Sequence, residues 1–134
     1  MAFFNKLFGK GEEQKNDGGQ QAFPWKNLEH ISDLESIALA SKEKTQVIFK
    51  HSTTCGISRM VIKMFTGDNA NLAAEETIDF HYLDLLQHRD ISNAIADTFG
   101  VIHESPQLLV IKNGKVVTNA SHGGINEIDL TNYA

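Results

Sequence analysis

The sequence predicts an α/β protein, a three-layer α/β/α sandwich around a mixed sheet of four or five strands. Apolar runs typical of strands alternate along the chain with segments whose apolar residues recur at helical spacing. Such alternation requires parallel strands joined by right-handed crossovers. Near the end, Asn113-Gly114 separates two strand-like runs, which predicts a β-hairpin and therefore an antiparallel edge.

The N-terminal part differs in composition from the rest. Residues 9–21, "GKGEEQKNDGGQQ", are polar and glycine-rich, as flexible linkers are. We therefore predict a flexible N-terminal extension over residues 1–23 and one folded domain over residues 24–134. The apolar residues before the linker have helical spacing and predict a short frayed or docked helix; a membrane-surface helix is the less favoured alternative, because only two lysines accompany them. These residues are Phe3, Phe4, Leu7 and Phe8.

The folded part begins with a helix and a buried strand. An optional first strand is predicted near residues 25–28. A helix over residues 32–42 follows, since Ser32 and Glu35 match a capping box. Residues 46–51, "QVIFKH", are rich in β-branched and aromatic side chains and predict a strand.

The middle of the chain repeats this pattern. A second helix begins at or next to Cys55, because apolar residues recur at helical spacing from 57 to 65. Gly67 predicts a break in it. Residues 78–85 alternate as a strand does, and residues 89–100 predict a further helix that ends at its last glycine.

The last third predicts the hairpin and a closing helix. Residues 107–112, "QLLVIK", predict a third buried strand, and residues 115–120 its antiparallel partner. The chain then turns at Gly123-Gly124, and we expect a final helix to start near Asn126.

Charge and composition exclude several functions. The net charge of -5 argues against nucleic-acid binding, which needs clustered lysine and arginine. No apolar run approaches the ~20 residues of a membrane span. A single cysteine cannot form an internal disulfide, which favours a cytoplasmic protein. The six histidines show no metal-ligand spacing, so no metal site is expected.

Cys55 is the candidate reactive group. It follows a strand end and opens a helix, where the N–H groups of Ile57, Ser58 and Arg59 should converge and favour a thiolate. Ser58, one turn later, either donates a hydrogen bond to that thiolate or is a helix-start residue without a catalytic part. The alternative for Cys55 is a small buried hydrophobic residue. His51 either tunes the thiol or is a hydrogen-bonded structural histidine.

Two motifs carry a family resemblance. The element order, with "FGVIHESPQLLVIKNGKVV" over residues 99–117, resembles the thioredoxin fold, in which the proline corresponding to Pro106 is cis. The motif Thr54-Cys55-Gly56-Ile57-Ser58 resembles the active site of the monothiol bacilliredoxins. Gly56 stands where that family more often has proline, and it brings the motif closer to that of the monothiol glutaredoxins.

The bacilliredoxin resemblance implies a thiol–disulfide oxidoreductase of redox homeostasis and stress response. Its partners would be S-thiolated client proteins, and its co-substrate a low-molecular-weight thiol, namely bacillithiol. Cys55 would be the nucleophile, assisted by Ser58, with Thr54, Gly56 and Ile57 contacting the substrate. Without a second cysteine, an external thiol or a separate reductase would complete the cycle. No tightly bound cofactor is expected.

Two further segments resemble binding elements. Ser105 and Pro106 would present backbone to the substrate, as the corresponding loop does in the thioredoxin fold; the alternative is an ordinary turn. Gly123, Gly124 and Asn126 are similar to the glutaredoxin turn that holds a glutathione carboxylate, and would hold the malate group of bacillithiol. The alternative is a plain glycine turn, since Asn126 replaces the usual acid.

Two rival functions stay open at this point. One is an iron–sulfur carrier of the monothiol glutaredoxin type, in which Cys55 and an external thiol would ligate a cluster shared across a dimer. The other is a redox-inert thioredoxin-like adaptor, whose cysteine would react no faster than free cysteine.

Overall fold

The computed structural model describes residues 22–134. The predicted linker and the apolar segment from Phe3 to Phe8 lie outside the described residues. Phe23, at the end of the predicted extension, packs against the core, with its ring 4.9 Å from that of Phe80. Within residues 22–134, no helix is both long enough and apolar enough to span a bilayer.

Five strands form one mixed sheet, with the order β1-β3-β2-β4-β5. Strands β1 and β2 run parallel to β3, whereas β4 is antiparallel to both β2 and β5. The strands are β1 (Trp25–Asn27), β2 (Thr45–His51), β3 (Ile78–Asp84), β4 (Gln107–Lys112) and β5 (Lys115–Ser121). The helices are α1 (Asp33–Ala40), α2 (Gly56–Asp68), α3 (Ala70–Ala74) and α4 (Arg89–Phe99), with 3₁₀ turns η1 (His122–Glu127) and η2 (Leu130–Asn132).

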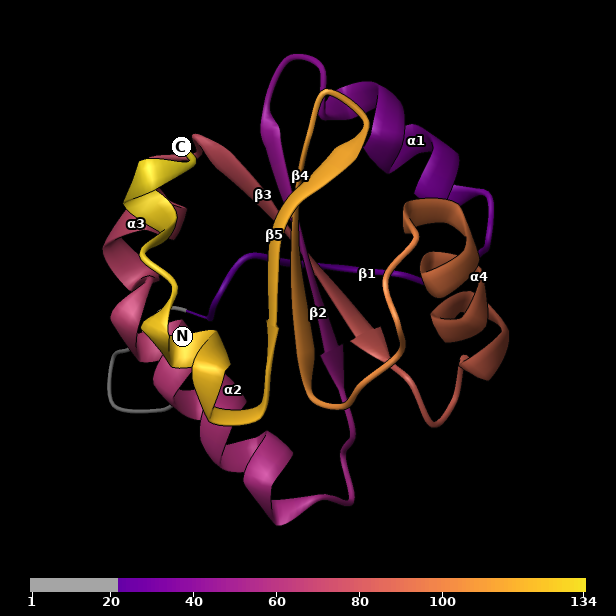
Figure 1. The fold of residues 1–134 in the computed structure, drawn as a ribbon. Helices are drawn as coiled ribbons and strands as arrows, with labels where there is room; N and C mark the ends of the chain where they lie inside the picture. Colours follow the sequence, from indigo (N-terminus) through magenta and orange to yellow (C-terminus); the bar gives the residue numbers. More distant parts are fainter. Residues whose placement is uncertain (1–21) are drawn as a thin grey trace, which may run out of the picture.

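The predicted three-layer sandwich is confirmed. Figure 1 shows α2, α3 and the C-terminal turns on one side of the sheet, and α1 with α4 on the other. Alternate residues of β2 feed two separate cores. Val47 and Phe49 pack with Phe65 of α2, whereas Ile48 packs with Ile95 of α4. This alternation is the two-residue period of a strand buried on both faces.

Aromatic rings fill the α2 side of the sheet. Trp25 of β1 stacks on Phe65 with ring centroids 6.0 Å apart. Its ring also lies 5.8 Å from Tyr82, which in turn lies 5.7 Å from His51. A continuous aromatic layer therefore extends from the β1 edge to the end of β2.

The tight turns follow their predicted chemistry. Gly100 ends α4 in the left-handed region, with φ 68°. Asn113 and Gly114 both have positive φ, 54° and 77°, which is the geometry of a two-residue hairpin turn. The Ser105–Pro106 bond is cis.

Three local expectations are wrong. Ser32 makes no side-chain cap; instead, the Asp33 carboxylate accepts the N–H groups of the preceding turn, those of Glu29 and His30. Helix α2 continues through Gly67 to Asp68, because tertiary packing outweighs the modest cost of one glycine. The final helix expected near Asn126 is replaced by the short turns η1 and η2.

Candidate functional site

Three predicted segments meet at one end of the sheet, where β2 and β5 finish and β4 begins. Lys50 near the end of β2 pairs with Gln107 at the start of β4, and Gln107 pairs with Ser121 at the end of β5. The loop after β2, the loop before β4 and the turn after β5 therefore emerge side by side. The His122 N–H donates to the Pro106 carbonyl at 3.1 Å, which ties the glycine turn to the cis-proline loop.

Cys55 occupies the N-cap position of α2. It has extended backbone, with φ -97° and ψ 121°, and its thiol is free and half-buried. The first helical hydrogen bond runs from the Arg59 N–H to the Cys55 carbonyl at 3.0 Å. The N–H groups of the residues between them have no intrahelical acceptor and favour negative charge at this end of the helix.

Ser58 is completely buried in the first turn of α2. Its Oγ accepts the Ser52 N–H at 3.1 Å and lies 2.8 Å from His51 Nδ1. Ser52 in turn accepts the Cys55 N–H at 3.2 Å through its carbonyl. The Ser58 hydroxyl thus fastens the loop between β2 and Cys55, and its hydrogen bonds go to that loop and to His51. The predicted part of Ser58 in exchange stays a prediction.

The side chains around the thiol are open to solvent. Thr54 and Gly56 are exposed, and Ile57 is 59% exposed. Ile57 begins an apolar stripe on the outer face of α2 that continues with Met60 and Met64. The side chain of Arg59 donates to the Thr53 carbonyl at 3.3 Å, so its positive charge lies at the loop that precedes Cys55.

The Gly123-Gly124 turn reaches the site, but Asn126 lies further away. Both glycines lie in η1 with room for a Cβ and without positive φ. Asn126 contacts Met64, nine residues beyond Cys55 along the chain, with Nδ2 3.9 Å from Sδ. Its Oδ1 is buried and has no hydrogen-bond partner among the described residues. The predicted role of these residues in binding stays a prediction.

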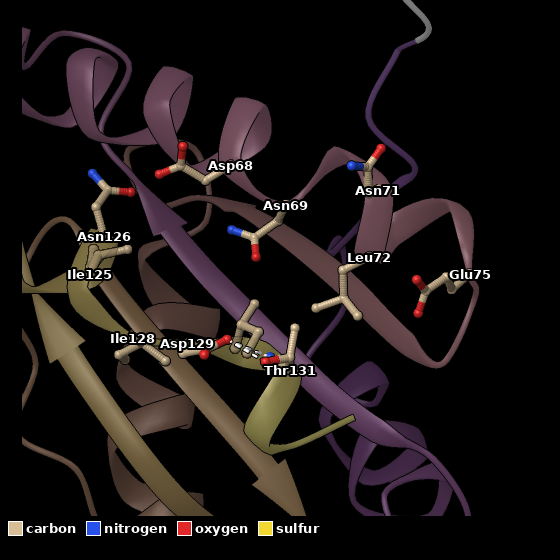
Figure 2. A pocket seen from close by; sticks show the side chains of 11 residues that line it. Asp68, Asn69, Asn71, Leu72, Glu75, Ile125, Asn126, Ile128, Asp129 and Thr131 are labelled. Atoms are coloured by element: carbon tan, nitrogen blue, oxygen red, sulfur yellow. Dashed lines mark hydrogen bonds between the residues drawn. The ribbon is translucent and has the colours of Figure 1, made fainter.

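Asn126 also lines a hollow of about 280 Å³ at the C-terminal end of α2. Figure 2 shows the side chains of Asp68, Asn69 and Asn126 on its upper rim, with Asp129 and Thr131 below. Cys55 does not line it. This hollow is therefore separate from the thiol.

The sequence reasoning missed a second cluster, on the other face of the sheet. Lys50 is completely buried, and its Nζ lies 3.0 Å from Nδ1 of His103. The Ser92 hydroxyl of α4 contacts the same nitrogen at 3.0 Å. Burial lowers the pKa of Lys50 to about 8. A lysine inside an otherwise apolar strand was the available signal, and His103 is too distant in sequence to be paired with it in advance.

His51 and His103 lie in different surroundings near the site, but the pKa of each is lowered. Burial lowers the pKa of His51, Asp84 raises it and Arg59 lowers it. Burial also lowers the pKa of His103, and the charge of Lys50 lowers it further. Both imidazoles therefore favour the neutral form. Within residues 22–134, no group of three or more metal-ligating side chains is assembled.

Comparison with solved structures identifies the class of protein. A candidate oxidoreductase with a thioredoxin fold is 37% identical, with a TM-score of 0.63 over 75% of this chain and 84% of that chain. Thioredoxins of Fasciola hepatica and Schistosoma mansoni, 22% and 24% identical, superpose with TM-scores of 0.57 and 0.58. These matches cover 76% and 77% of this chain, and 88% and 87% of those chains. The fold is thioredoxin-like, and the class is that of thiol oxidoreductases.

The family is narrower than the class. The model of the monothiol bacilliredoxin BrxC matches residues 26–130. The chain belongs to the monothiol bacilliredoxin family.

Proposed function

We propose that this protein is a cytoplasmic monothiol oxidoreductase that removes bacillithiol from S-thiolated client proteins, with Cys55 as the nucleophile. The observation that carries the proposal is the position of Cys55. It is a free, half-buried thiol at the N-cap of α2, at the same end of the sheet as the Ser105–Pro106 loop. A helix N-terminus supports a thiolate, which is the attacking species in disulfide exchange.

The reaction proceeds in two thiol–disulfide exchange steps. The Cys55 thiolate attacks the bacillithiol sulfur of the mixed disulfide. The old S–S bond breaks, and the client leaves as a thiolate that takes up a proton. Cys55 now carries bacillithiol in a new disulfide. The chain has no second cysteine, so the thiolate of an external thiol or of a separate reductase attacks the bacillithiol sulfur of this disulfide. A new disulfide forms between the attacking thiol and bacillithiol, the bond to Cys55 breaks, and Cys55 leaves as the thiolate.

The surrounding residues supply contacts for both halves of the substrate. The client chain would lie along the Ser105–Pro106 backbone and against exposed Thr54, Gly56 and Ile57. The turn at Gly123 and Gly124 would face the bacillithiol portion, with Asn126 further along η1. The fully buried Ser58 keeps the loop that holds the thiol in place through Ser52.

A reduction assay tests the proposal. A client protein carrying bacillithiol is incubated with the purified protein, and the released client is followed by mass spectrometry. We expect release by the wild type with Cys55 becoming bacillithiolated, and no release by Cys55→Ser. Clients carrying glutathione provide the comparison. Equal release from both clients would refute bacillithiol selectivity, and a brown protein on anaerobic purification would point to the cluster-carrier alternative.

A further inference from the structure

On the α1 side of the sheet, a chain of hydrogen bonds fixes the position of the proton on His81. The side-chain nitrogen of Gln46 lies 3.0 Å from the Lys44 carbonyl and 2.9 Å from the Asp79 carboxylate. Asp79 is ionised, since the ammonium groups of Lys26 and Lys44 each lie 3.0 Å from it. Both partners of the Gln46 nitrogen can therefore only accept, so the Gln46 oxygen faces His81 Nε2, 2.7 Å away. Nε2 must carry the ring proton and donate it.

The other ring nitrogen, Nδ1, is left as a bare acceptor. Burial lowers the pKa of His81 to about 4, so the ring is neutral at pH 7 and Nδ1 keeps its lone pair. Among residues 22–134 nothing donates to Nδ1, yet this nitrogen is not one of the buried atoms that lack a partner. It is therefore the open point of a side chain that is only 8% exposed. The hydrogen bonds from Nε2 to Gln46 and on to Asp79 make Nδ1 a stronger acceptor.

The exposed part of His81 lies in a second hollow, of about 300 Å³, between α1 and the sheet. Ile37 and Ala40, which share one face of α1, and Leu28, which follows β1, give this hollow apolar walls. Its volume lies at the lower end of the range found for small-molecule sites. Cys55 does not line it, so the hollow is separate from the thiol.

The lining defines the chemistry that a ligand must have. Nδ1 of His81 accepts, so the ligand must donate an O–H or an N–H group. The carboxylates of the lining already have partners in the protein, because Asp79 pairs with two lysines and Asp33 accepts two backbone N–H groups. An ionised ligand would find no free counter-charge there, whereas an uncharged ligand leaves these pairs intact.

We propose that this hollow binds an uncharged small molecule with a compact apolar body and one O–H or N–H donor, of which phenol is the simplest example. The donor group binds His81 Nδ1, and the apolar body packs against Leu28, Ile37 and Ala40. The site does not depend on the proposed role of Cys55, so Cys55→Ser should bind phenol as the wild type does.

The first test titrates the wild-type chain with phenol and with anisole, which carries a methyl group in place of the hydroxyl hydrogen. NMR follows the ring nitrogens of His81 and the backbone amides. We expect phenol to shift Nδ1 of His81 and the amides of Leu28 and Ile37, and anisole to bind about tenfold more weakly because it cannot donate. Equal affinities, or no shift of His81 at phenol concentrations that leave the protein folded, would overturn the proposal.

The second test fills the hollow. Ala40→Leu enlarges a side chain on the α1 wall and should weaken phenol binding about tenfold. Ala38→Leu, the same change on the same helix but outside the lining, is the matched control and should bind as the wild type does. Thermal unfolding shows whether both variants are folded. Wild-type affinity in Ala40→Leu would overturn the proposal, and the comparison of phenol with anisole decides it even where a variant is unstable.

Discussion

The end of β2 places two neighbouring polar side chains on opposite faces of the sheet, and their environments differ. His51 faces α2, where the buried Ser58 hydroxyl satisfies it and connects it to the loop of Cys55. Lys50 faces α4, where its buried amine has His103 as hydrogen-bond partner and no carboxylate in an ion pair among the described residues. A buried histidine can stay neutral at pH 7 at little cost in free energy, whereas a buried lysine must either keep its charge or lose a proton at a larger cost. On the α2 face, His51 and Ser58 order the loop that carries the thiol. On the α4 face, Lys50 holds the loop before Pro106 through His103, and burial of its charge costs free energy.

Replacing the buried charge should give the largest effect. Lys50→Met keeps the volume and removes the amine, so we expect the free energy of unfolding at pH 7 to rise by about 2 kcal/mol. Folding lowers the pKa of Lys50 from 10.5 to about 8. The unfolded chain therefore holds the extra proton between these values, and wild-type stability recovers as the pH rises through them.

Urea unfolding at pH 7 and pH 10 measures this difference. The advantage of Lys50→Met should be full below pH 8 and much smaller at pH 10. A variant less stable than the wild type at pH 7 would show that the contact with His103 outweighs the burial of the charge, and the contrast between the two faces would disappear.

Removing the hydroxyl on the α2 side should give the next largest effect. Ser58→Ala leaves the buried Ser52 N–H and His51 Nδ1 without their partner, so we expect a loss of about 1–2 kcal/mol. The loop should also loosen, with faster hydrogen exchange at the Ser52 and Cys55 amides. Denaturant unfolding and amide exchange give the two readouts. Unchanged exchange at Ser52 would contradict the anchoring role of Ser58.

The corresponding change on the α4 side should give the smallest effect. Ser92→Ala removes the second hydroxyl, but His103 Nδ1 keeps its contact with Lys50 and the His103 ring is exposed to water. We expect a loss of about 0.5 kcal/mol, measured by the same unfolding experiment. A loss as large as that of Ser58→Ala would mean that the two hydroxyls are equivalent.

Local patterns were sufficient for most of the fold. The β-branched run of β2 and the turn at Asn113-Gly114 depend on neighbouring residues alone, and the sequence predicted both. The predicted C-terminal helix does not form, because the chain packs against α2 through the short turn η1 and ends in a second short turn, η2. At Ser32, the predicted side-chain cap does not form, and the Asp33 carboxylate binds the N–H groups of Glu29 and His30 before the helix instead. A motif of two residues cannot foresee this contact.

The candidate site was predicted in outline. Cys55 could be placed at a helix start because the strand and the helix were both clear from spacing. The hydrogen-bond partners of Ser58 could not be predicted, because its hydroxyl is held by His51 and Ser52, residues that sequence spacing does not bring into contact. The position of Asn126 could not be predicted either. The motif groups it with Gly123 and Gly124 in one binding turn, but η1 places its side chain against Met64 of α2.

The aromatic layer beneath the site gives the protein a built-in fluorophore. Trp25 is the only tryptophan in the chain, so all indole emission arises from one known position. Its ring is 5.8 Å from Tyr82, whose ring is 5.7 Å from His51. Emission recorded without any attached dye therefore reports on the packing that connects the β1 edge to the end of β2, and follows in real time whether a substitution there disturbs the core.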